Sequence, residues 1–207
     1  MTGERKLYFV TAIGTDSGKT LASAILCEAL VADYWKPIQA GLPADADTVR
    51  GLITNPDVTI HPEAYRLKTP ESPHAAAQRE GLHVHIGDLK LPTTTRPLVI
   101  EGAGGCMVPI NDREFVIDIA SHFSAAVILV SNFYLGSINH TLLTIEALNQ
   151  RSLKIAGIIF NGSRNAESER IIMQHANCPC ILHIDQEANI SKETVQKYAV
   201  KAPVGIL

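Results

Sequence analysis

Short apolar runs rich in valine, isoleucine and tyrosine alternate along the chain with segments of helical length. The clearest runs predict strands at residues 6–12, 34–38, 97–101, 125–131, 155–160 and 180–184, with a weaker one near Tyr65. Because these runs are apolar throughout, we expect strands buried on both faces. Helical spacing of apolar residues predicts helices at residues 19–33, 115–122, 139–150, 166–176 and 191–199. The alternation predicts one α/β domain over residues 1–207, with a doubly wound, mostly parallel sheet of about seven strands flanked by helices.

Composition narrows the possible partners of this chain. Hydrophobic residues make up 46% and charged residues 19%, which excludes a disordered chain. The formal net charge of −3 provides no overall basic field for a nucleic acid or an anionic membrane. Neither a signal peptide nor a run of ~20 apolar residues is present, so we expect a cytoplasmic protein without a membrane or nucleic-acid partner.

The first predicted strand leads directly into AIGTDSGKT, residues 12–20, and then into the longest predicted helix. In this context glycine lets backbone N–H groups face phosphates, Lys19 reaches the terminal phosphates and the Thr20 hydroxyl can bind magnesium. Ile13 stands where the pattern GxxxxGK[ST] has its first glycine, so a chance GKT at a helix start is the alternative. The order of strand, loop and helix favours a phosphate loop of the P-loop NTPase type.

A second candidate is PLVIEGAGG, residues 97–105, in which an apolar strand ends in Glu101 and a glycine-rich turn. Ligands of doubly wound folds bind at the carboxyl ends of strands. A carboxylate there can hold magnesium against nucleotide phosphates. Taken alone, the motif favours a tight turn whose acid caps a loop; the nearby phosphate loop favours the magnesium role instead.

The third candidate is KPIQAG, residues 36–41, followed by Asp45 and Asp47. Lys36 is either a solvated lysine at the sheet edge or a cation directed at a charged substrate or phosphate. Asp45 or Asp47 could supply a further magnesium ligand. Sequence spacing leaves both questions open.

Six motifs in order, VTAIGTDSGKT, KPIQAG, SPHAAA, EGAGG, INHTLLT and IIFNGS, resemble the dethiobiotin synthetase family from Val10 to about Asn161. The phosphate loop and the strand-end acid also occur in cobyrinic acid amidases and partitioning ATPases. The combination of KPIQAG, SPHAAA and EGAGG is specific to the synthetases.

The resemblance implies an ATP-dependent enzyme of biotin synthesis. In this family 7,8-diaminopelargonate takes up carbon dioxide as a carbamate, ATP phosphorylates the carbamate, and the second amine displaces phosphate to close the ring of dethiobiotin. The resemblance further implies that the nucleotide contacts Gly14, Thr15, Asp16, Ser17, Gly18, Lys19, Thr20, Glu101, Gly102, Ala103, Gly104 and Asn161.

Individual roles carried over from the family are also expectations. Lys19, Lys36 and Thr15 correspond to catalytic residues, and Asn161 to the asparagine that recognises the purine. Magnesium is expected at Thr20, Asp47 and Glu101. The substrate is expected at Lys36, Ala40, Gly136 and Ser137, the last two belonging to the partner subunit of a homodimer. Ala12 and Ala40 depart from the family pattern, which often has glycine and a hydroxyl residue at these positions.

Two other functions compete with the synthetase. A nucleotide-dependent switch of the partitioning type usually carries a second lysine in its phosphate loop, and residues 13–17 contain none. An amidating synthase would need a glutaminase domain, for which 207 residues leave no room. The histidines form no HExxH motif or tight cluster, so we expect no histidine metal site.

Overall fold

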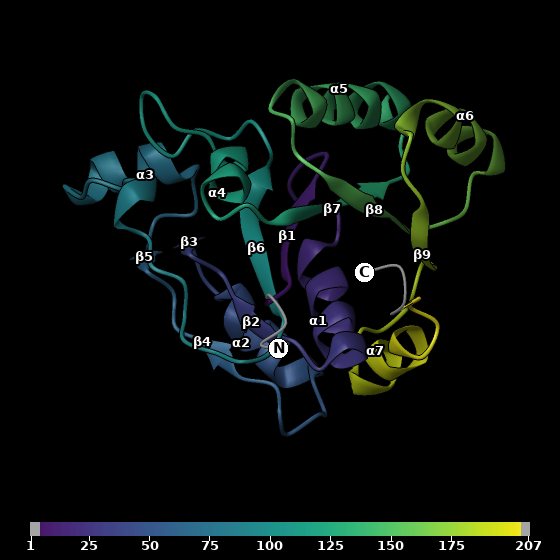
Figure 1. Cartoon of the computed structure of the whole chain (residues 1–207), viewed down its shortest axis with the longest axis horizontal. Helices are drawn as coiled ribbons and strands as arrows, with labels where there is room; N and C mark the ends of the chain where they lie inside the picture. Colours follow the sequence, from purple (N-terminus) through teal and green to yellow (C-terminus); the bar gives the residue numbers. More distant parts are fainter. Residues whose placement is uncertain (1–4, 204–207) are drawn as a thin grey trace.

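The computed structural model describes residues 5–203, which are built around a seven-stranded sheet in the order β4-β2-β6-β1-β7-β8-β9 (Figure 1). Every pairing within this sheet is parallel. Its strands are β1 (Leu7–Ala12), β2 (Asp33–Trp35), β4 (Ile60–His61), β6 (Leu98–Gly105), β7 (Ala126–Asn132), β8 (Ile155–Asn161) and β9 (Cys180–Ile184). A separate parallel pair joins β3 (Ile38–Ala40) to β5 (Tyr65–Leu67). The predicted doubly wound sheet is therefore confirmed.

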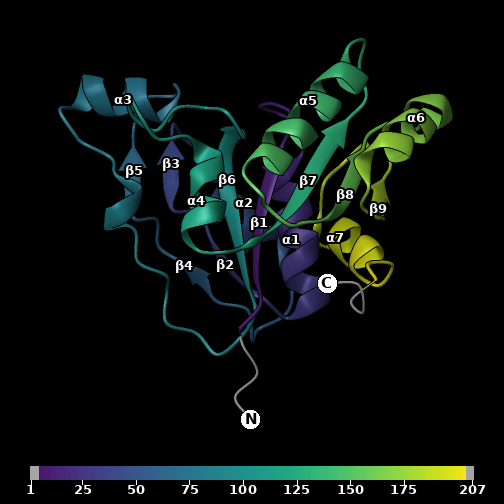
Figure 2. The same cartoon turned by 45° about the horizontal axis from the view of Figure 1, so that its top comes forward.

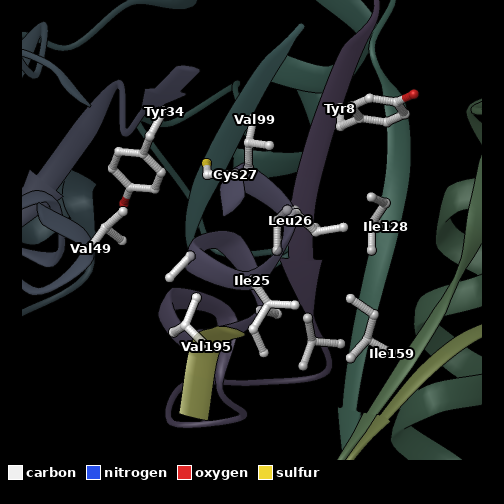
Figure 3. Close-up of a cluster of buried hydrophobic side chains, with 14 of the residues drawn as sticks. Tyr8, Ile25, Leu26, Cys27, Tyr34, Val49, Val99, Ile128, Ile159 and Val195 are labelled. Atoms are coloured by element: carbon white, nitrogen blue, oxygen red, sulfur yellow. The ribbon is translucent and has the colours of Figure 1, made fainter. Parts of the chain in front are cut away.

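Helices cover both faces of the central sheet (Figures 1 and 2). One layer contains α1 (Lys19–Leu30), α2 (Asp45–Leu52) and α7 (Lys192–Ala199), and the other contains α4 (Val116–His122), α5 (Ser137–Gln150) and α6 (Ala166–Ala176). Each face of the sheet has its own hydrophobic core, because successive side chains of a strand point to opposite faces. Val10 packs with α1, whereas its neighbour Phe9 packs with α4. Figure 3 shows part of the first core, with Ile25, Leu26 and Val195 facing the strands.

Two predicted elements have different boundaries in the structure. The strand expected at residues 34–38 is divided at Lys36 and Pro37 into β2 and β3, which belong to different sheets. Proline has no N–H to continue a ladder, which explains the division. The helix expected to reach Asp33 ends at Leu30, because Val31 adopts a left-handed φ of 49°.

The seventh strand was expected near Tyr65, but Tyr65 lies in β5 of the small sheet, and β4 completes the central one. Among the described residues, the strands are also connected by elements that were not predicted: α2, α3 (Pro73–Glu80) and the 3-10 turn η1 (Ile86–Asp88). Both α2 and α3 border the site described below. Within residues 5–203, no helix is long and apolar enough to cross a membrane.

Candidate active site

The loop between β1 and α1 is tied together by hydrogen bonds to its own backbone. Lys19 Nζ and Ser17 Oγ donate to the carbonyl of Gly14 at 3.1 and 3.2 Å. Gly18 caps α1 with a left-handed φ of 96°, and a Cβ at Gly18 would collide with the side-chain amide of Asn161. Asn161 Nδ2 in turn donates to Ser17 O at 3.0 Å. Glycine is therefore needed at position 18 for both its φ and the close approach of β8.

The carboxylate of Glu101 joins three elements beneath this loop. Its Oε1 accepts from Thr20 Oγ1 at 3.1 Å and Lys36 Nζ at 3.2 Å, and its Oε2 accepts from Tyr34 Oη at 3.1 Å. The register between β2 and β6 explains why these side chains come together. Trp35 of β2 pairs with Ile100 of β6, so the residues that follow them, Lys36 and Glu101, lie side by side. Glu101 is 1% exposed, so this acid is part of a buried polar cluster at the end of the sheet.

Lys36 is held between two carboxylates. It is 3% exposed, and its Nζ lies 2.5 Å from Asp45 Oδ2 in addition to its contact with Glu101. Burial alone would lower the pKa of Lys36, but Glu101 and Asp45 raise it above its ordinary value. Lys36 is thus a charged, buried cation rather than a solvated lysine at the sheet edge.

Lys19 is the second cation of the site, and its surroundings differ from those of Lys36. It is 7% exposed, and burial lowers its pKa from the ordinary value. Glu101 opposes that shift, while the neighbouring charge of Lys36 adds to it. Two lysines and two carboxylates, Glu101 and Asp45, therefore balance in charge at the edge of the sheet. Anionic phosphates entering this edge would meet Lys19 directly at the end of its loop.

Asp45, rather than the expected Asp47, is the aspartate at this cluster. Both lie in the first turn of α2, but residues two apart on a helix point about 200° apart. Because Asp45 contacts Lys36, Asp47 is directed away, where it pairs with Arg50 at 2.6 Å and Arg66 at 3.8 Å. The Asp47 side chain is 58% exposed. This placement favours Asp45 over Asp47 as the aspartate on the magnesium side, and the ligand itself stays a prediction.

A cleft of about 690 Å³ opens above the cluster, a size typical of small-molecule sites. Its walls include nine of the residues expected at the site, together with Asp45 and the start of α3. The nine are Thr15, Asp16, Gly18, Lys19, Thr20, Lys36, Ala40, Ala103 and Gly104. Gly102 is not among them, and a Cβ there would approach Phe9 Cζ at 2.9 Å, so packing accounts for that glycine.

Gly136 and Ser137 do not reach this cleft. They begin α5 and line a separate hollow with Tyr134, Leu135 and Arg164. Gly136 has a left-handed φ of 104°, and Ser137 is buried. Within one chain, these two expected substrate residues are therefore separate from the cleft that contains Lys19 and Lys36.

Two residues of the site were not singled out from the sequence as ligands or supports. Gln39 Oε1 accepts from the backbone N–H of Asp45 at 3.1 Å, and its Nε2 donates to Gly41 O at 3.0 Å, which fixes the loop before α2. Ser72, just before α3, lines the cleft. Both lie in motifs that carried the resemblance, KPIQAG and SPHAAA, so the motifs were the signal for them.

The oxygen atoms near Lys36 suit a magnesium ion. Thr20, Asp45 and Glu101 offer a hydroxyl and two carboxylates, the hard ligands that Mg²⁺ prefers. Across the described part of the chain, no group of three or more histidine, cysteine or acidic residues could hold a metal by itself. Phosphate and water oxygens would complete the coordination, as is usual for Mg²⁺ in nucleotide sites.

In this chain, a strand of a parallel sheet leads into a lysine-bearing loop, and the loop leads into a helix. This arrangement defines the chain as a P-loop nucleotide-binding α/β protein. The fold is similar to the ParA family ATPase from Chlorobium tepidum, with a TM-score of 0.56, 10% identity and coverage of 96% of this chain and 92% of that one. It is also similar to the septum site-determining protein MinD from Pyrococcus horikoshii, determined with Mg-ADP, with a TM-score of 0.53, 16% identity and coverage of 96% and 88%. At these identities the likeness concerns the fold alone.

Sequence comparison identifies the family. A family model described as an AAA domain matches residues 6–194. The ATP-dependent dethiobiotin synthetase BioD of Cytophaga hutchinsonii is 56% identical over 198 residues, which cover 95% of this chain and 96% of that protein. The BioD of Christiangramia forsetii is 48% identical and covered to 95% on both sides. The chain belongs to the dethiobiotin synthetase family, which confirms the resemblance and extends it well beyond Asn161.

Proposed function

We propose that this chain catalyses the ATP-dependent closure of 7,8-diaminopelargonate and carbon dioxide into dethiobiotin, in the cytoplasm, as a step of biotin biosynthesis. One observation carries the proposal: a single cleft joins the phosphate loop to the Lys36–Ala40 segment and the start of α3. One amine and carbon dioxide, supplied as bicarbonate, form a carbamate. The carbamate oxygen attacks the γ-phosphorus of ATP and ADP leaves. The second amine then attacks the carbamoyl carbon and releases phosphate.

Two buried lysines supply the charge that phosphoryl transfer requires. Negative charge on the phosphoryl oxygens must be stabilised where water is scarce. Lys19 extends from the phosphate loop towards the site of the terminal phosphates, and Lys36 enters from β2 on the substrate side. Lys36 would orient the carbamate towards the phosphorus, and Lys19 would stabilise the transferring group. Thr15, on the wall between them, would donate its hydroxyl to carbamate or phosphate oxygens.

Magnesium fits between the acids and the nucleotide. Thr20, Asp45 and Glu101 would hold it, and it would supply neutralising charge to the phosphates of ATP. Asp16 would face the nucleotide, and Asn161, at the end of β8, would offer donor and acceptor groups to the purine. The hydrogen bond from Asn161 to Ser17 O holds that amide beside the phosphate loop, which supports this position.

A homodimer would complete the substrate site. Exposed apolar side chains lie in both hollows beside α5: Met107 and Leu143 line one, and Tyr134 and the fully exposed Leu135 line the other. Exposed apolar side chains gathered in this way are typical of an interface. In a two-fold dimer the start of α5, with Gly136 and Ser137, would reach the substrate carboxylate bound by the other chain.

Mixing two inactive variants tests the composite site. A Lys19→Ala chain lacks the phosphate-loop cation, and a Ser137→Asp chain sets negative charge against the substrate carboxylate. After subunit exchange we expect part of the activity to return, because each mixed dimer contains one intact site. Light scattering should give a mass twice that of the 22.4 kDa chain. A monomer, or no recovery after proven exchange, contradicts the composite site.

Product analysis tests the function itself. The protein is incubated with ATP, Mg²⁺ and bicarbonate, with and without 7,8-diaminopelargonate, and ADP and dethiobiotin are measured. We expect ADP release that depends on the diamine and equals dethiobiotin formed. ATP hydrolysis without diamine and without dethiobiotin would instead indicate a switch of the partitioning type.

The two aspartates of α2 provide a matched pair for the magnesium assignment. Asp45→Asn should raise the Mg²⁺ concentration needed for half-maximal turnover by roughly tenfold or more. Asp47→Asn, which alters an exposed ion pair, should change it by less than about twofold. Titrating Mg²⁺ at saturating ATP measures both. The reverse order of effects would return the metal to Asp47.

A further inference from the structure

The phenol of Tyr34 has its ring in the apolar core and its hydroxyl in the polar cluster. The ring is fully buried between α1 and α2, in the cluster shown in Figure 3 with Cys27 and Val49. The hydroxyl donates to Glu101 Oε2 at 3.1 Å. Among residues 5–203, Oε2 accepts from this hydroxyl alone, whereas Oε1 accepts from Thr20 and Lys36.

Strand geometry explains why the two carboxylate oxygens of Glu101 accept hydrogen bonds from different donors. Tyr34 pairs with Val99 in the parallel ladder, and residues two apart on a strand share one face, so Tyr34 and Glu101 lie on the same face. The side chain of Glu101 is 0% exposed, so water cannot replace a missing donor easily. With Oε2 occupied from the core side, the carboxylate plane is set and Oε1 is directed at Thr20 and Lys36, both of which line the cleft.

We propose that Tyr34 is a positioning residue that orients Glu101 for magnesium-nucleotide binding. The inference rests on the proposed function, because it assumes that Glu101 binds a cation brought with ATP. Ligands that bind metals through oxygen depend on the groups that orient them from behind, and loss of such a group typically costs about 10–100-fold in metal affinity. Tyr34 acts through Glu101 and touches neither substrate nor nucleotide.

Tyr34→Phe removes the hydroxyl while keeping the ring that fills the core. Tyr8→Phe is the matched control, since Tyr8 lies in the same apolar cluster on β1, is 4% exposed, and has a hydroxyl without a hydrogen-bond partner in the described structure. Calorimetry would measure the affinity for a non-hydrolysable ATP analogue in EDTA and in Mg²⁺, and thermal unfolding would report the state of the fold.

For Tyr34→Phe we expect unchanged affinity in EDTA and an enhancement by Mg²⁺ that is about tenfold smaller than in the unmodified protein. Turnover should recover when Mg²⁺ is raised, and Tyr8→Phe should match the unmodified protein throughout. An enhancement equal to that of Tyr8→Phe would overturn the role of Tyr34, as would equal losses in EDTA and Mg²⁺. If the unmodified protein gains no affinity from Mg²⁺, the magnesium site fails as well, which distinguishes that outcome.

Discussion

Replacing Lys19 with alanine is expected to lower diamine-dependent turnover by at least about a hundredfold. Lys19 is 7% exposed and its ammonium donates to the carbonyl of Gly14, so its charge lies at the end of the phosphate loop with little solvent screening. Under the proposed mechanism, this is the phosphate-loop cation that stabilises the charge developing on the transferring phosphoryl group. Single-turnover measurement of dethiobiotin at saturating ATP tests the loss in the chemical step.

An exposed lysine supplies the control for Lys19. Lys90 lies on the surface before β6, away from the cleft, and Lys90→Ala should leave turnover within about twofold of the unmodified value. Both variants should unfold at similar temperatures, because Lys19 forms no salt bridge within the described residues. Near-full activity of Lys19→Ala would remove the phosphate-loop assignment.

The buried parts of the fold were predictable because their signal is local. Strands such as β1, β7, β8 and β9 are apolar on both faces, and the structure moves their predicted ends by one residue or not at all. The unpredicted helices α2 and α3 have eight residues each and few large apolar side chains, so helical periodicity is weak in both. Contacts with β3, β5 and α1 stabilise these helices, and such contacts are not visible in a sequence.

Site residues that belong to a sequence motif could be predicted from the sequence. Site residues that are chosen by tertiary contacts could not. Lys19, Thr20, Lys36 and Glu101 come together as expected, because the first three follow β1 or β2 and Glu101 lies in β6 of the same parallel sheet. The choice of Asp45 over Asp47 depends on the phase of a helix that the sequence did not predict. Tyr34 reads as an ordinary core residue, since only the register between β2 and β6 brings its hydroxyl to Glu101.

Replacing Lys36 with glutamine is expected to nearly abolish diamine-dependent turnover and also to lower the free energy of unfolding. For a solvated lysine at the sheet edge, one of the two roles that the sequence left open for Lys36, the same change would leave the fold unaffected. The structure adds a cost, because Glu101 and Asp45 would lose the cation between them, and removing one partner of a buried pair commonly costs about 3–5 kcal/mol. Asp45 is partly exposed, so we expect the lower part of this range.

Stability and catalysis must therefore be measured separately for Lys36→Gln. Below its lowered unfolding temperature, the variant should bind ATP but form dethiobiotin at least about a hundredfold more slowly, since the carbamate has lost its cation. Lys36→Gln combined with Asp45→Asn relieves the unpaired charge and should restore part of the thermal stability without restoring turnover. If stability returns and the double variant forms dethiobiotin as fast as Asp45→Asn alone at saturating Mg²⁺, Lys36 serves only the fold. Unchanged kinetics in the single variant would exclude it from the reaction.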